Sequence, residues 1–180
     1  LSEAALIRIS DTANQEIKGI SAHTFRIVAP RTGREQDYVF FSDSPTPGFY
    51  DPSFGFANAP STLKRVGDKL PVSANYSLVG NYAIELGWSS QTGGDWGAAI
   101  AGIGWVGRDL TLKDTLSIKA FSENGLSSQQ IPFVYVEDLS NRKSAKVDLS
   151  AYVPEIGAKA WKEIRIPLQV FKDNPGSADL

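Results

Sequence analysis

The chain has 180 residues, 42% hydrophobic and 21% charged, with a formal net charge of −2 at pH 7. These values predict a soluble globular protein, and the weak negative charge argues against nucleic acid or an anionic bilayer as a partner. Cysteine is absent and histidine occurs once, as His23, which excludes disulfides, thiolate catalysis and cysteine-ligated zinc. The longest apolar stretch, residues 98–106, is far shorter than the ~20 residues that a membrane-spanning helix needs.

The first 29 residues contain two strand-like runs, residues 5–9 and 24–28, which we predict to pair as a hairpin. The sequence of this region, IRISDTANQEIKGISAHTFRIV, resembles the last two strands of the immunoglobulin-like domains that precede binding modules in bacterial surface proteins. Residues 30–37 are rich in charge and in proline and glycine, and are the predicted linker. Because the sequence begins at Leu1 and lacks methionine, we expect it to be an internal part of a longer chain.

From residue 38 onward, short apolar runs alternate with turn signals, and none keeps a helical period over three turns. Residues 42–60 hold four prolines interleaved with Tyr50, Phe54 and Phe56, and are predicted to form a long loop that closes one end of the core. The predicted strands are residues 38–41, 82–88, 97–103, 115–120, 133–137, 145–149 and 163–168. This pattern predicts an all-β fold, an antiparallel β-sandwich.

Alternation assigns faces within some of these strands. Tyr82, Ile84, Leu86 and Trp88 share one apolar face, which should meet the core. Residues 133–137 are apolar on both faces, which predicts either a central strand or a strand whose second face lies under a ligand groove.

Three strand motifs occur in order over residues 38–171: the glycine-led GNYAIELGW, the tryptophan-led GGDWGAAI, and WKEIRIPLQVF. In this order they resemble the galactose-binding-like carbohydrate-binding modules of families 11 and 4. The resemblance implies a jelly-roll sandwich at residues 38–180 that binds polysaccharide without cleaving it. It also implies a secreted or cell-surface bacterial protein whose other domains are catalytic or anchoring. In that group one more strand follows, and residues 172–180 do not supply it.

Aromatic residues are the candidate ligand contacts, because sugars present flat patches of C–H bonds that lie well on aromatic faces. Trp96 and Trp105 have glycine neighbours, which would let a ligand approach the backbone closely. Trp161 is interpreted as a packing residue, because the resembling family uses it so. The competing interpretation places the other tryptophans in the core as well. The predicted ligand-binding residues are Trp88, Trp96, Trp105, Asp95, Arg108 and Tyr135.

A structural calcium ion is the one metal that the resemblance brings in, since many modules of that group hold one near the two ends of the domain. Calcium takes carboxylate and carbonyl oxygens as ligands. The acids available at these ends are Asp43, Asp51 and Asp179. The predicted function itself requires no cofactor.

An enzyme is the weaker interpretation. A glycosidase needs two carboxyl groups across a cleft, one protonated and one ionised, and no motif marks such a pair among Glu85, Glu137, Asp138 and Glu163. A serine hydrolase is disfavoured because G-x-S-x-G is absent and His23 lies in the N-terminal hairpin. We therefore predict a non-catalytic polysaccharide-binding module. The alternatives are a structural or adhesive spacer and, third, a jelly-roll hydrolase or lyase.

Overall fold

The computed structural model describes residues 37–176 and 178–179 and, before them, the backbone of four short strands. The chain divides into two compact units, Leu1–Val39 and Phe40–Leu180. The strands of the first unit are β1 (Ser2–Ala5), β2 (Arg8–Ser10), β3 (Lys18–Ile20) and β4 (Phe25–Ile27).

In the first unit β1 pairs with β4 and β2 pairs with β3, and both pairs are antiparallel. Of the two predicted runs, Ala5 lies opposite Phe25, whereas residues 8 and 9 belong to β2 and pair with β3. His23 and residues 30–36 of the predicted linker lie outside the described residues.

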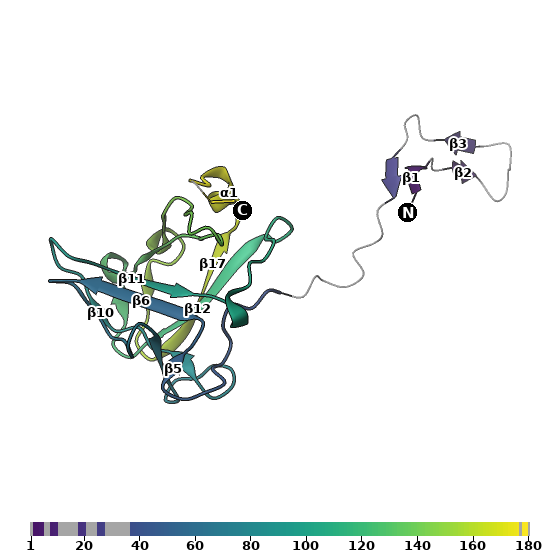
Figure 1. The fold of residues 1–180 in the computed structure, drawn as a ribbon. Helices are drawn as coiled ribbons and strands as arrows, with labels where there is room; N and C mark the ends of the chain where they lie inside the picture. Colours follow the sequence, from purple (N-terminus) through teal and green to yellow (C-terminus); the bar gives the residue numbers. More distant parts are fainter. Residues whose placement is uncertain are drawn as a thin grey trace. The chain divides into compact units, whose positions relative to one another are not determined.

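The second unit is an all-β antiparallel sandwich, as the sequence predicts (Figure 1). Its strands are β5 (Phe49–Tyr50), β6 (Ser53–Asn58), β7 (Thr62–Leu63), β8 (Leu70–Ser73), β9 (Ala83–Ile84), β10 (Trp88–Ser89), β11 (Asp95–Ile100), β12 (Thr115–Ser122), β13 (Leu126–Ser127), β14 (Phe133–Val134), β15 (Val147–Asp148), β16 (Glu155–Ile156) and β17 (Ala160–Pro167). The pairs are β5–β8–β9, β6–β11, β7–β10, β12–β17, β13–β16 and β14–β15. The described part of the chain contains no helix long and apolar enough to cross a membrane.

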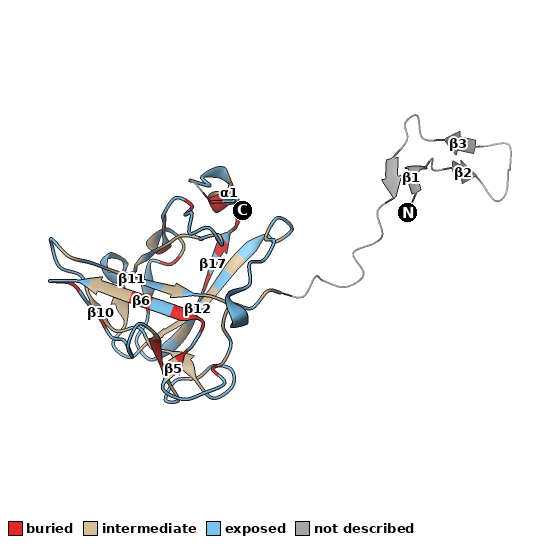
Figure 2. Ribbon diagram, in the orientation of Figure 1, coloured by how far each residue is buried: buried red, intermediate tan, exposed pale blue. Residues whose placement is uncertain are grey.

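The longest pair, β12–β17, carries the main core on one face. Its register places Leu116 opposite Ile166 and Ile118 opposite Ile164, and alternation sends all four side chains to the same side. Ile166 is fully buried, and the buried residues stand out in Figure 2. The core cluster on this face comprises Ile131, Leu149, Val153, Ile156, Ile164, Ile166, Leu168 and Phe171. Burial of each aliphatic side chain contributes about 1.5–3 kcal/mol.

A smaller buried group lies under β5–β8. Tyr50 and Leu70 are fully buried, and Tyr50 meets Phe41 edge to face at 4.8 Å between ring centroids. The Tyr50 hydroxyl lies 2.9 and 3.0 Å from the carbonyl oxygens of Phe40 and Ala101. This one phenol therefore ties the start of the unit to the end of β11.

The prediction of a long loop at residues 42–60 is wrong, because β5 and β6 lie within it. Pro45 and Pro47 precede β5, Pro52 separates the two strands and Pro60 follows β6, so none of these four prolines lies inside a strand. The alternation of small and aromatic residues in SFGFAN is the signal that the prolines concealed.

Other strand predictions are too long. Residues 82–88 contribute to two separate short strands, β9 and β10, which have different partners, and Leu86 is exposed rather than in the core. Residues 38–41 form no strand in the described unit. The strand predicted at 97–103 begins earlier, at Asp95, and stops at Ile100.

After β17 the chain turns into the short helix α1 (Gln169–Asp173), and the tail lies against residues 138–145. The Ala145 amide donates to the Asn174 carbonyl at 3.0 Å, and the Asp179 amide donates to Asp138 Oδ2 at 3.1 Å. The further strand implied by the resemblance is not among the described residues.

Candidate functional site

Trp88 and Trp96 lie side by side, with ring centroids 5.2 Å apart and planes inclined at 32°. Trp88 begins β10 opposite Leu63, and Trp96 lies near the start of β11 opposite Ala57. Both side chains are half-buried, so each ring keeps a part that faces solvent. The Trp96 Nε1–H donates to Ser90 Oγ at 2.9 Å, which fixes the orientation of the indole.

A glycine turn brings the two tryptophans together. Gly93 has a φ of +88°, a conformation that favours glycine. A Cβ on Gly94 would lie 2.5 Å from both the Asn58 carbonyl oxygen and the Ser61 nitrogen, so the backbone at this position leaves no room for a side chain. The turn therefore folds β11 back tightly enough for Trp96 to reach Trp88.

Polar side chains gather at the same end of β6, β7, β10 and β11. Asn58 Nδ2 donates to Asp95 Oδ1, and the hydroxyls of Thr62 and Ser89 lie 2.9 Å apart. Alternation puts Asp95 on the face opposite Trp96, so these groups border the sheet end rather than lie beneath the indoles. The arrangement offers an aromatic surface with hydrogen-bonding groups at its margin.

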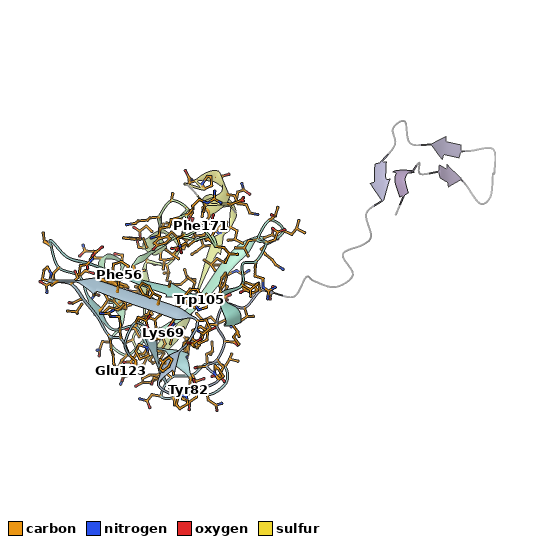
Figure 3. The ribbon with its side chains drawn as sticks, in the orientation of Figure 1. Phe56, Lys69, Tyr82, Trp105, Glu123 and Phe171 are labelled. Carbon is orange, nitrogen blue, oxygen red and sulfur yellow. The ribbon has the colours of Figure 1, made fainter. Side chains whose placement is uncertain are left out.

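The remaining predicted residues lie elsewhere. Trp105, 45% exposed, and Arg108 belong to the loop after β11, and the Lys69 ammonium lies 5.8 Å from the Trp105 ring centroid. Figure 3 shows Trp105 beside Lys69. Tyr135 follows β14, with Lys143 Nζ 5.3 Å from its ring centroid. The structure therefore brings together Trp88, Trp96 and Asp95, and leaves Trp105, Arg108 and Tyr135 outside this group.

Sequence reasoning missed a second aromatic group. Phe121 and Trp161 lie directly opposite each other on β12 and β17, and Tyr76 stacks on Phe121. Trp161 is half-buried and is not part of the core cluster, so its interpretation as a core residue is corrected. The signal was present, because alternation from the buried Ile164 and Ile166 points Trp161 outward.

The acids considered for catalysis are held by protein donors. Lys64 lies 2.7 Å from Glu85, and Lys143 lies 3.9 Å from Glu137. The hydrogen bond from Ser117, with help from the nearby Arg165, lowers the pKa of Glu163. No carboxyl pKa is raised among the shifts resolved in the described residues, so nothing marks the protonated acid that a glycosidase needs.

Asp138 shows the strongest of these effects. Burial opposes ionisation of its carboxyl group, but the amides of Asp179, Arg142 and Ser140 and the Arg142 side chain outweigh burial and lower the pKa to about 2. Arg142 Nε donates to Asp138 Oδ2 at 2.8 Å. The carboxylate therefore serves as an anchor for the C-terminal tail.

The three acids considered for calcium do not fit that ion. The Asp43 carboxylate accepts from the amides of Ser44 and Tyr82 at 2.8 and 2.9 Å. Asp51 lies 4.0 Å from Lys69 Nζ, and Asp179 lies 3.9 Å from the Arg142 guanidinium. Within the described ranges, no three histidine or carboxylate side chains gather as metal ligands would.

Comparisons with known proteins bear on the family of this chain. The family model described as carbohydrate binding domain 30 matches residues 37–180. A curated exo beta-1,2-glucooligosaccharide sophorohydrolase (non-reducing end) from Parabacteroides distasonis is 26% identical over 136 residues, 75% of this chain and 19% of that protein. The crystal structure of a beta-1,2-glucanase from Parabacteroides distasonis has a TM-score of 0.67 and 26% identity, over 76% of this chain and 20% of that chain.

These findings set the limits of the resemblance seen in the sequence. A carbohydrate-binding β-sandwich is confirmed, but the matching family is domain 30 and families 11 and 4 are not supported. The immunoglobulin-like interpretation of residues 1–29 stays a prediction. The chain spans about a fifth of the length of each relative. The activity named for those whole proteins is therefore not assigned to this chain.

Proposed function

Because the chain belongs to the carbohydrate-binding domain 30 family, we propose that this non-catalytic module binds a polysaccharide at Trp88 and Trp96. The observation that carries the proposal is the contact between these two partly exposed rings, whose centroids are 5.2 Å apart at a sheet end bordered by polar side chains. The module holds its ligand by stacking and hydrogen bonds in a groove on one sheet face and breaks no bond.

Stacking supplies most of the binding free energy in this proposal. A pyranose ring covers apolar area of the indoles and releases water, while its hydroxyl groups find partners at the margin. The hydrogen bond from Trp96 Nε1 to Ser90 holds the indole in one orientation, so less side-chain entropy is lost on binding. The Ser90 hydroxyl, which accepts from the Trp96 indole, can still donate a hydrogen bond to the sugar.

The first ligand to test is a β-1,2-linked glucan, because the names of both relatives contain that linkage. We place the module in a larger secreted or cell-surface protein with catalytic or anchoring domains, preceded by an immunoglobulin-like unit at residues 1–29. Binding there raises the local concentration of a catalytic partner on its polymer, which requires no chemistry from the module itself.

The test is affinity electrophoresis in gels containing β-1,2-glucan, other soluble β-glucans, xylan, mannan, galactan or xanthan. Trp96→Ala and Trp88→Ala should each abolish retardation by the polymer that retards the unaltered protein. Leu112→Ala is the control, because Leu112 is exposed and is not one of the residues of the Trp88–Trp96 site. Trp105→Ala tests whether the loop after β11 contributes to the same site.

The competing spacer function has its own support in two strongly exposed aliphatic side chains, Ile103 and Leu139. Exposed apolar side chains of this kind suit contacts with another protein domain. If no polymer retards the unaltered protein, the polysaccharide proposal is wrong and the spacer replaces it.

A further inference from the structure

The outer face of β12–β17 carries a continuous row of three aromatic rings. Tyr76, from the loop between β8 and β9, stacks on Phe121 with centroids 4.5 Å apart and planes 20° from parallel. Phe121 in turn lies 5.7 Å from Trp161, at an angle of 47°. Residues from three separate segments of the chain therefore form one aromatic surface.

A polar ladder continues from this row along the same face. The register pairs Lys119 with Glu163 and Ser117 with Arg165, two and four residues from the aromatic pair, and alternation keeps all of them on one side. Ser117 Oγ donates to Glu163 Oε1 at 2.8 Å, and Arg165 lies 3.1 Å from the same oxygen. All four side chains are exposed, so the ladder presents donors and acceptors to solvent.

The position of the row argues against a role in the core. The core cluster occupies the other face of the same strands, and Tyr76 is 43% exposed. A hydrogen bond to the Glu123 carboxylate holds the Tyr76 phenol and raises its pKa. In Figure 3, Glu123 and Phe171, a core residue, lie at opposite ends of the unit.

We propose that this outer face, defined by Tyr76, Phe121, Trp161, Ser117, Lys119, Glu163 and Arg165, is a further glycan-binding surface that takes an uncharged, extended polysaccharide chain along β12–β17. The class of ligand rests on the proposed function, but the surface shares no residue with the Trp88–Trp96 site. Sugar rings stack on Tyr76 and Trp161, and hydroxyl groups of the next sugars along the chain meet the ladder.

The charges on this face favour an uncharged ligand. Lys119 and Arg165 lie beside Glu163, and Lys159 lies 3.9 Å from Glu123, so each acid on this face has a basic partner and the excess of positive charge available to a polyanion is small. Paired side chains of opposite charge still offer hydrogen bonds to hydroxyl groups, which act as both donors and acceptors. An uncharged chain also predicts that binding depends little on salt.

The experiment uses the whole chain in the same polymer gels, with Tyr76→Ala as the principal variant. Tyr76 lies on a loop, so its removal leaves the ladders of β12 and β17 intact. Loss of one aromatic stacking partner should weaken binding about 2- to 10-fold. Leu78→Ala is the matched control, since Leu78 is 44% exposed on the same loop. Trp161→Ala should weaken binding to the same polymer. Circular dichroism checks that each variant is folded.

The outcomes separate this surface from the Trp88–Trp96 site. If Trp96→Ala weakens binding and Tyr76→Ala does not, the further surface is wrong and the first site stands. If Tyr76→Ala weakens binding and Trp96→Ala does not, the Trp88–Trp96 site is wrong and the further surface stands. Retardation of no polymer overturns both. A response to Tyr76→Ala confined to the anionic xanthan, and lost at 0.5 M salt, would overturn the uncharged ligand.

Discussion

The two longest strand pairs use their apolar residues in opposite ways. In β12–β17 one face is sealed by the core, and Ile164 and Ile166 are almost completely buried. In β6–β11 Phe54 lies opposite Ala99 and remains 45% exposed, although it is as apolar as its buried counterparts. Alternation tells which residues share a face, but only the covering segments decide which face is buried. Stability should therefore reside mainly in the first pair.

The largest expected effect tests this difference directly. Ile166→Ala removes a fully buried side chain from the core cluster and should lower the free energy of unfolding by about 2–5 kcal/mol. Phe54→Ala, in the other pair, should cost less than about 1 kcal/mol despite the larger side chain removed. Urea unfolding followed by tryptophan fluorescence measures both. Similar losses for the two variants would show that β6–β11 is covered to the same degree.

A middle-sized effect is expected where the two parts of the unit are joined. Tyr50→Phe keeps the buried ring but removes the hydroxyl that reaches the carbonyl oxygens of Phe40 and Ala101. The loss should be about 1 kcal/mol, the net value of a buried hydrogen bond. It should come with faster amide exchange near Ala101 and unchanged exchange in β17. Uniform acceleration throughout the unit would mean that Tyr50 acts through the core as a whole.

The same contrast explains how much of the fold could be predicted. Burial alternates over the first six residues of β12 and over residues 163–167 of β17, and the sequence places both strands within two or three residues. β6 is difficult to predict because prolines surround it, although its own residues alternate. Residues 82–88 alternate equally well but form ladders only at their ends. Strand pairing is a long-range property, so local alternation alone could not show that this segment changes its partner from β8 to β7 along its length.

The candidate site divides along similar lines. Trp88 and Trp96 are eight residues apart and joined by a glycine turn, so their proximity follows from local sequence. Tyr76 and Phe121 are forty-five residues apart, and nothing local relates them. The outward direction of Trp161 was readable from Ile164 and Ile166, yet family resemblance took precedence over alternation. A period of two within a strand is therefore the stronger guide to the exposure of a side chain.

The smallest effect concerns the tail beside the β12–β17 core, and it depends on pH. The pKa of Asp138 is lowered to about 2 in the folded chain, so its stabilising contribution is complete above its ordinary value near 4 and is lost as the pH falls towards 2. Asp138→Asn should lower the unfolding temperature at pH 5, and the gap from the unaltered protein should close by pH 2. Asp51→Asn is the control, because the Asp51 carboxylate is exposed and 4.0 Å from Lys69 Nζ, and it should leave the unfolding temperature almost unchanged. A gap that stays constant from pH 5 to pH 2 would show that the carboxylate charge does not hold the tail, and that shape alone keeps it against the core.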